Sequence, residues 1–115
     1  MGYDKWAERW IKGVNDRDLD TALALYSPAI EMRSSFAKVY AGGGVIKGKE
    51  ALRSYWGELF RRTPLLKLTL LEIYSGHGSF SIHHRDHLGR NCMETVVFND
   101  AGEAIFETAC RDRLR

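Results

Sequence analysis

The sequence predicts one α+β domain, in which three N-terminal helices pack on a curved, mainly antiparallel sheet. Two patterns support this class: apolar residues recur at helical spacing in the first half of the chain, and extended stretches joined by glycine-containing turns fill the second half. The third observation is size, because 115 residues, 44% of them hydrophobic and 28% charged, suffice for one self-supporting core. We therefore expect residues 1–115 to form a single domain.

Helical spacing predicts three helices. The first covers residues 3–14, where apolar side chains return every three or four positions and charged side chains occupy the other face. A second, shorter helix begins after Asp18, which is suited to cap it, and carries Tyr26 on its apolar face. The third covers residues 51–60 and ends before Pro64. The first two helices are expected to form a hairpin.

Alternation of polar and apolar side chains predicts five strands. One strand covers residues 29–36, between the second and third helices. Four more follow the third helix, at residues 66–74, 79–86, 90–99 and 103–112. Each connection between these four is short and contains a glycine, which permits the positive φ of a tight turn. The second half of the chain is therefore expected to be an antiparallel meander.

Charge and cysteine content exclude several classes of protein. Seventeen Lys and Arg against 15 Asp and Glu give a net charge of +2, which is too small for the long-range field of a nucleic-acid-binding protein. The chain shows no secretory signal and no apolar run of membrane-spanning length, so we expect a cytoplasmic protein with no membrane partner. Cys92 and Cys110 form no metal or redox motif and are typical of reduced thiols.

Several short motifs accompany this order of elements, at residues 15–20, 25–28, 48–52, 87–90 and 98–102. With them, essentially the whole chain resembles the nuclear-transport-factor-2-like superfamily, and within it the SnoaL-like polyketide cyclases and the ketosteroid isomerases. The resemblance implies a cone-shaped α+β barrel that encloses one pocket. It leaves the activity open, because members of this superfamily perform unrelated tasks on one scaffold.

Glu94 is the first catalytic candidate. It lies in mid-strand on the same face as Cys92, Val96 and Phe98, and burial among apolar neighbours is expected to raise its pKa. The resemblance to ketosteroid isomerases places Glu94 where that family has an acidic residue that donates a hydrogen bond to the substrate oxygen. A surface position, or a salt bridge to an arginine such as Arg111, is the structural alternative.

The pairing of two strands decides which histidine accompanies Glu94. A hairpin closed at residues 88–89 places His83 opposite Glu94, whereas a bulge at Gly89 brings in His84 instead. Either arrangement gives a histidine–carboxylate couple. Because successive strand residues face opposite sides, His83 and His84 cannot bind the same ion. His84 and Asp86 are the one pair that could share an ion, but a histidine on a sheet near a turn is more often hydrogen-bonded or solvated, so we expect no metal and no cofactor.

The resemblance also directs a set of ligand-binding side chains toward the pocket. These are Trp10, Tyr26, Met32, Ser34, Tyr55, Glu107 and Arg111. Trp10 stands where ketosteroid isomerases have their oxyanion tyrosine, and Ser34 where they have their aspartate base. Serine alone cannot act as a general base near neutral pH, so isomerisation of steroids by that machinery is not expected.

We therefore expect a cofactor-independent isomerase, cyclase or dehydratase that acts by proton transfer on a small, apolar carbonyl or hydroxyl compound. Glu94 would hydrogen-bond or protonate the substrate oxygen, and His83 or His84 would move a proton to or from carbon. Epoxide hydrolysis by two carboxylates and an arginine is a third possibility. The alternative to an enzyme is a non-catalytic ligand-binding or dimerisation module. The expected surface of a homodimer consists of Leu71, Ile73, Met93, Val97 and Phe106.

Overall fold

The computed structural model describes residues 2–40 and 42–112, which form four helices and six strands. The helices are α1 (Tyr3–Asn15), α2 (Leu19–Leu23), α3 (Ser35–Tyr40) and α4 (Lys49–Arg62). The strands are β1 (Tyr26–Ser34), β2 (Val45–Lys47), β3 (Thr69–Ser75), β4 (Ser79–Arg85), β5 (Asn91–Phe98) and β6 (Ala104–Arg111).

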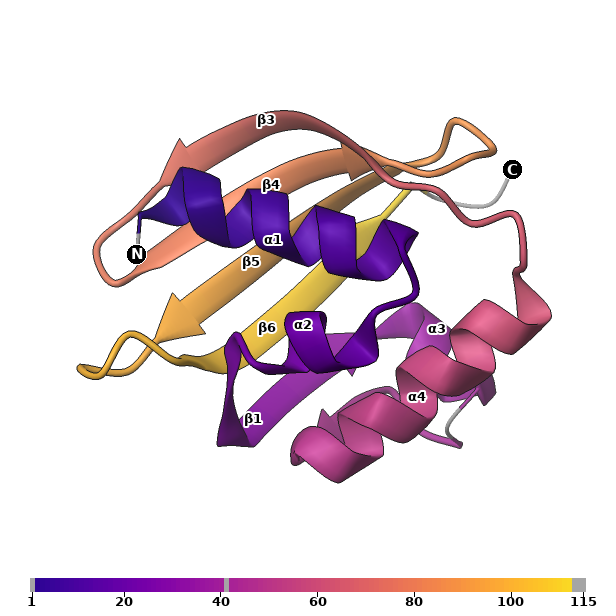
Figure 1. Ribbon diagram of the computed structural model, residues 1–115, viewed down its shortest axis with the longest axis horizontal. Coiled ribbons are helices and arrows are strands. Elements are labelled where there is room, and N and C mark those ends of the chain that lie inside the picture. Colours follow the sequence, from indigo (N-terminus) through magenta and orange to yellow (C-terminus); the bar gives the residue numbers. More distant parts are fainter. Residues whose placement is uncertain (1, 41, 113–115) are drawn as a thin grey trace.

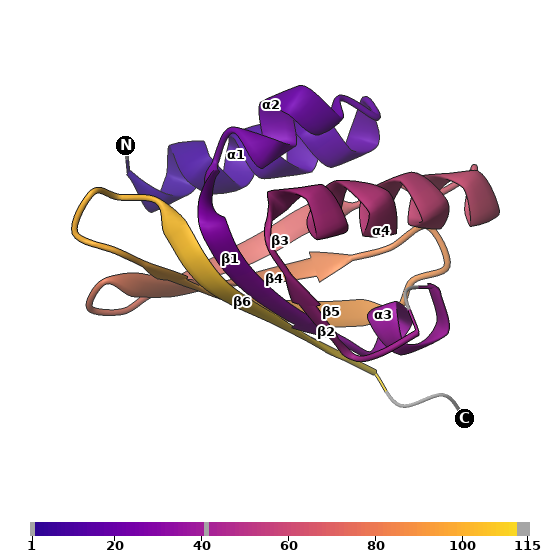
Figure 2. The same ribbon diagram turned by 90° about the horizontal axis from the view of Figure 1, so that it is seen from below.

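All six strands belong to one sheet, in the order β2-β1-β6-β5-β4-β3. Neighbouring strands run antiparallel except β1 and β6, which run parallel. The sheet is curved and open, and α1, α2 and α4 form a layer over one of its faces (Figures 1 and 2). This architecture confirms the predicted α+β class and the mainly antiparallel sheet.

The region between α2 and β2 differs from the sequence-based expectation. The predicted second helix ends at Leu23, and Tyr26 is the first residue of β1 and not a helical residue. Pro28 is tolerated in this strand because the pairing with β6 is irregular between Tyr26 and Glu31, so no regular ladder bond is lost there. The strand then stops at Ser34, whose Oγ accepts a hydrogen bond from the backbone N–H of Phe36 and so helps to begin α3.

Helix α1 and helix α2 pack closely at Gly13. A Cβ atom at this position would lie 3.0 Å from the Cβ of Ala22, so a larger residue would push the two helices apart by a few tenths of an ångström. Helix α1 buries Trp6 and Trp10 against the sheet, as its apolar stripe predicts. In the described part of the chain, no helix is long and apolar enough to cross a membrane.

The segment between α4 and β3 is held to α1 by polar side chains. The predicted strand began at residue 66, but β3 begins at Thr69 because the preceding residues are bonded to α1 instead of to a neighbouring strand. The side-chain amide of Asn15 donates to the carbonyl of Leu68 at 2.9 Å and accepts from its N–H at 2.8 Å. This segment consequently presents Leu66 and Leu68 to the space beneath the helices.

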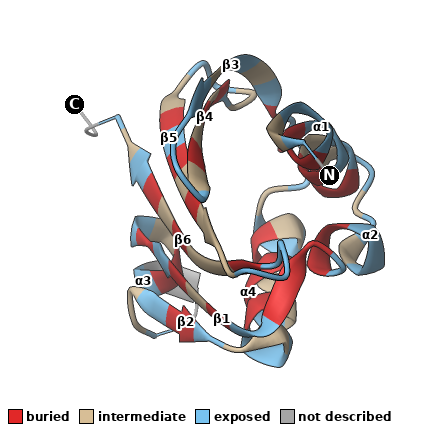
Figure 3. Cartoon of the chain, turned by 90° about the vertical axis from the view of Figure 1, so that its left-hand side faces the viewer, coloured by how far each residue is buried: buried red, intermediate tan, exposed pale blue. Residues whose placement is uncertain are grey.

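Buried and more exposed residues alternate along the strands, as Figure 3 shows for β5 and β6. The buried row of β4 contains Phe80, Ile82 and His84, and that of β5 contains Cys92, Glu94 and Val96. Phe80, Ile82 and Val96 belong to the hydrophobic core, together with residues of α1 and β1. His84 and Glu94 are therefore polar residues on a core-facing surface.

Candidate active site

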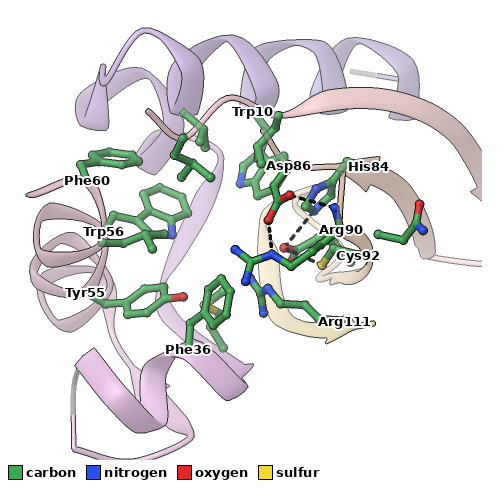
Figure 4. A pocket seen from close by; sticks show the side chains of 17 residues that line it. Trp10, Phe36, Tyr55, Trp56, Phe60, His84, Asp86, Arg90, Cys92 and Arg111 are labelled. Carbon is green, nitrogen blue, oxygen red and sulfur yellow. Dashed lines mark hydrogen bonds and ion pairs between the residues drawn. The ribbon is translucent and has the colours of Figure 1, made fainter. Parts of the chain in front are cut away.

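A cavity lies between the helices and the inner face of the sheet (Figure 4). Its apolar end is formed by α1, α4 and the segment after α4, through side chains that include Trp10, Val14, Trp56, Leu59, Phe60 and Leu68. Its polar end includes His84, Asp86, Arg90, Cys92, Glu94 and Arg111. About 50 Å³ of this space is open to water-sized molecules, so a larger ligand must displace side chains on binding.

The register of β4 and β5 selects His84 as the partner of Glu94. His84 pairs with Cys92 and Ile82 pairs with Glu94, so His84 and Glu94 are diagonal neighbours on the inner face. The Nε2 atom of His84 lies 3.3 Å from Oε1 of Glu94, and both side chains are almost fully buried. His83 faces the other side of the sheet, where its Nε2 lies 2.9 Å from the side-chain oxygen of Asn91. The site therefore excludes His83.

The turn between β4 and β5 explains this register. Arg85 pairs with Asn91, which leaves a five-residue connection from Asp86 to Arg90. Gly89 has a φ of +79° within it, and this conformation strains most other residues. The connection shifts the pairing by one residue from a hairpin closed at residues 88–89. The alternative expected for a bulge at Gly89, with His84 on the inner face, is the one observed.

A second buried carboxyl group lies behind Glu94. Glu107, on β6, is fully buried and accepts a 2.6 Å hydrogen bond from the hydroxyl of Tyr26. Burial and the charge of Glu94 raise the pKa of Glu107 well above its usual range. Glu107 therefore keeps its proton to a higher pH than an exposed glutamate does.

Glu94 itself remains ionised. Burial opposes ionisation, but the hydrogen bond of His84, the positive charge that His84 carries when protonated, the neighbouring carboxyl group of Glu107 and the charge of Arg111 together lower the pKa of Glu94. The expectation that Glu94 has a raised pKa is wrong, because it counted only the strand's own apolar neighbours. Of the two carboxyl groups, Glu107 on the neighbouring strand β6 holds a proton more firmly than Glu94 does.

This charge distribution fixes the tautomer of His84. An ionised Glu94 only accepts hydrogen bonds, so Nε2 of His84 must carry the proton. In the neutral imidazole Nδ1 then bears a free lone pair. It has no hydrogen-bond partner among the described residues. The arrangement resembles that of other carboxylate-oriented histidine bases, in which one ring nitrogen is held and the other accepts a proton.

The thiol of Cys92 completes the buried cluster. Its Sγ donates a weak hydrogen bond to Oε1 of Glu94 at 3.7 Å. Burial and the charge of Glu94 raise the pKa of the Cys92 thiol, which therefore stays protonated and is not a nucleophile. In the part of the chain that the structure describes, the donor atoms of His84, Cys92 and Glu94 lie within 4.8 Å of one another and could hold a metal ion. Such an ion would have to displace both protons that now bond to Glu94.

Two arginines occupy the polar end of the cavity. The Nε of Arg90 is paired with Asp86 at 2.8 Å. Arg111 donates to Oγ of Ser34 at 2.9 Å, and its guanidinium lies 3.9 Å from the ring centre of Phe36. The Oγ of Ser34 is also 3.3 Å from the hydroxyl of Tyr55, whose pKa burial raises to about 12. Tyr55 is therefore a neutral hydroxyl group at neutral pH.

The structure brings most of the predicted site residues together. Those that line the cavity are Trp10, Met32, Tyr55, His84, Glu94 and Arg111. Ser34 lies behind them, hydrogen-bonded to Tyr55 and Arg111, and Tyr26 donates to Glu107. Sequence reasoning missed the lining residues Phe36, Asp86, Arg90 and Cys92. Only Cys92 carried a usable signal, since it shares the strand face of Glu94; the other three depend on the turn and on α3.

An open, curved sheet covered by helices, with polar groups on its inner face, defines a protein of the nuclear-transport-factor-2-like superfamily. Residues 7–108 match the model of the SnoaL-like domain, and the chain belongs to this family. A SnoaL-like protein of unknown function from Burkholderia thailandensis shares 29% identity and a TM-score of 0.89, over 96% of this chain and 93% of that chain.

Two more distant structures share the fold. A putative polyketide cyclase from Sinorhizobium meliloti is 10% identical, with a TM-score of 0.78 over 92% of this chain and 94% of that chain. TerC, co-crystallised with polyporic acid, is 15% identical, with a TM-score of 0.79 over 94% of this chain and 89% of that chain. No curated protein is significantly similar to this chain in sequence.

Proposed function

We propose that this protein is a cofactor-independent isomerase, cyclase or dehydratase that transfers a proton on a small, largely apolar carbonyl or hydroxyl compound. The observation that carries this proposal is the buried pair of His84 and Glu94 on the wall of the cavity. The lone pair on Nδ1 of His84 is the base. Ionised Glu94 orients the ring and stabilises the imidazolium that forms, so its role differs from that of a proton donor to the substrate.

The proposed chemistry needs no redox partner. Nδ1 of His84 takes a proton from the carbon beside a carbonyl group, and the electron pair of the broken C–H bond moves into an enolate. The imidazolium then gives this proton to another carbon in an isomerisation, or to the oxygen that forms when the enolate attacks a second carbonyl group in a cyclisation. In a dehydration it gives the proton to the departing hydroxyl group.

The surroundings of His84 suit such a reaction. The His84 ring centre lies 5.4 Å from that of Trp10, and the apolar end of the cavity excludes bulk water from the base. A putative polyketide cyclase has the same fold, which supports cyclisation as one reaction that this scaffold can carry. Epoxide hydrolysis by ionised Glu94 and Glu107 is disfavoured because the pKa of Glu107 is raised and its carboxyl group is bonded to Tyr26.

The proposal is tested by hydrogen–deuterium exchange at the α-carbon of 2-tetralone, followed by NMR. We expect exchange above the buffer rate, reduced by about 10²-fold or more in His84→Asn, because a positioned general base contributes roughly that factor. His83→Asn is the matched control, since it changes the neighbouring residue on the outer face. Exchange at the buffer rate, or equal rates for His84→Asn and the native protein, would contradict the proposal and favour a ligand-binding module.

A further inference from the structure

We propose that the polar end of the cavity is an oxyanion-binding site, and that the natural ligand is a flat apolar ring compound bearing a carboxylate or an ionised enol or phenol oxygen. Arg90, Arg111 and Phe36 form this site. The inference rests on the proposed function, because it names the substrate class of the same cavity, and it adds a negative charge that a neutral carbonyl compound lacks.

The first observation is that Arg111 has unused hydrogen-bonding capacity. It forms no ion pair with any residue that the structure describes, and its side-chain hydrogen bond is donated by Nη1 to Ser34. A guanidinium group has five N–H donors in a planar fork that matches a carboxylate. A half-buried arginine without a carboxylate partner is therefore able to take one from a ligand.

Arg90 adds a second guanidinium whose orientation is fixed. Asp86 accepts from its Nε at 2.8 Å and from its backbone N–H at 2.9 Å, while the terminal nitrogens have no described partner. Because Asp86 offsets the charge of Arg90, the positive charge of Arg111 is the one left without a carboxylate within ion-pair distance. Ionised Glu94 lies deeper and accepts from His84, so an anion would bind at the arginine end, away from Glu94.

Aromatic side chains lie at both ends of the cavity and favour a flat ligand. The guanidinium of Arg111 lies 3.9 Å from the ring centre of Phe36 and that of Arg90 lies 5.6 Å from it (Figure 4). These contacts align the donors at one end of the cavity. The opposite end is walled by Trp56, Phe60 and aliphatic residues, which offer surface to an apolar ring but no charge. The narrow space suits a ring better than a bulky aliphatic group.

The backbone supports this placement. Arg111 ends β6 and pairs with Cys92, which places it beside the buried cluster. Asp112 accepts from the backbone N–H of Asn91 at 2.6 Å and ties the end of β6 to the start of β5. Arg111 is therefore held at the cavity by the sheet, although its long side chain can move to admit a ligand.

The test compares two unreactive probes, 2-naphthoate and its neutral isostere 2-naphthamide, by isothermal titration calorimetry. We expect the native protein to bind the acid about tenfold more tightly or better, since charge-assisted bonds to arginine are stronger than neutral ones. Arg111→Met should abolish this preference and Arg90→Met should reduce it. Arg85→Met, which removes an exposed arginine on the outer side of β4, is the control and should retain it.

Equal affinities for the two probes in the native protein, or no binding of either, would overturn the inference without recourse to any variant. A preference that persists in a folded Arg111→Met protein would overturn it as well. If the native protein prefers the acid but does not accelerate exchange on 2-tetralone, only the proposed function is refuted. Exchange on 2-tetralone without any acid preference would refute only this inference.

Discussion

The two faces of the β4–β5 hairpin carry similar residues in different environments. His84 on the inner face is 3% exposed and contacts a carboxylate, whereas His83 on the outer face is half-buried and contacts the amide of Asn91. A histidine held by a buried carboxylate has a fixed tautomer and a free lone pair. A histidine beside an amide and solvent has neither constraint. Burial, and not residue type, therefore decides which of two adjacent histidines can act as a base.

The largest difference in stability between the two faces is expected when a buried and an exposed carboxyl group are each removed. Glu107→Ala leaves the hydroxyl of Tyr26 without its acceptor and opens a cavity beside Glu94, so we expect a loss of about 2–4 kcal/mol in the free energy of unfolding. Glu72→Ala on the exposed face of β3 should change it by less than about 0.5 kcal/mol. Urea denaturation of both variants measures the contrast. Similar losses would mean that Glu107 is not integrated in the buried cluster.

Glu94→Gln tests the charge on the inner face. The amide still accepts from His84, but the charge-assisted bond is lost, so we expect the variant to be about 1–2 kcal/mol less stable at pH 7. The lowered pKa of Glu94 gives the sign: stability from its ionised form is present above the unfolded pKa and is lost as the pH falls through the folded pKa. The difference in the free energy of unfolding between the variant and the native protein should therefore become smaller at acidic pH. A variant more stable than the native protein at pH 7 would reverse this assignment.

Glu107→Gln should have the opposite pH dependence. The pKa of Glu107 is raised by burial and by Glu94, so its stabilising effect is complete below the unfolded pKa and is lost as the pH rises through the folded pKa. Glutamine keeps an acceptor for Tyr26 and cannot ionise. We expect this variant to gain stability relative to the native protein as the pH rises above the unfolded pKa of glutamate, measured by urea denaturation at several pH values. A difference that stays constant with pH would indicate that the pKa of Glu107 is not raised.

The sequence predicted the class of fold because its signals were local. Helical spacing and glycine-containing turns depend on neighbouring residues, and both appear where expected in α1, α4 and the meander. The shared face of Cys92 and Glu94 followed from strand alternation alone. The choice between His83 and His84 did not, because it depends on one residue of register in the β4–β5 turn.

The charges of the site were also beyond a local reading. Glu94 acquires its lowered pKa from His84 on β4 and from Glu107 and Arg111 on β6, which are distant in sequence. The parallel pairing of β1 with β6 brings Tyr26 to Glu107 across 81 positions. The short helix α3, which supplies Phe36, follows a strand directly and has no separate hydrophobic pattern. The charges of the site and the position of Phe36 therefore depend on contacts between residues that are distant in sequence, which local sequence patterns do not predict.

A smaller effect is expected from replacing Trp10, which tests whether this side chain lines the cavity or only fills the core. Trp10 and Trp56 line the cavity, whereas Trp6 packs against Tyr26 and Phe80. Binding of 2-naphthamide should change the tryptophan fluorescence, and Trp10→Phe should reduce the change while the fold is retained. Trp6→Phe is the control and should preserve it. A signal that disappears with Trp6 would contradict the proposed cavity.

The smallest change in stability is expected on the outer face, where we predict that two copies of the chain associate. Leu71 and Met93 are 39% and 36% exposed, and Val97 pairs with Phe106 on the same side of the sheet. Ile73 packs against the core instead, so it does not belong to the predicted dimer surface. Val97→Lys should change the free energy of unfolding of the monomer by less than about 0.5 kcal/mol, because the side chain can reach solvent. It should nevertheless dissociate the dimer, since two added charges would face each other across a symmetric interface. Sedimentation at micromolar concentration would then give about twice the chain mass for the native protein and one chain mass for the variant. Leu88→Lys is the control. It adds the same charge in the β4–β5 turn and should remain dimeric. A monomeric native protein would contradict the prediction and show that the outer face of the hairpin is solvated.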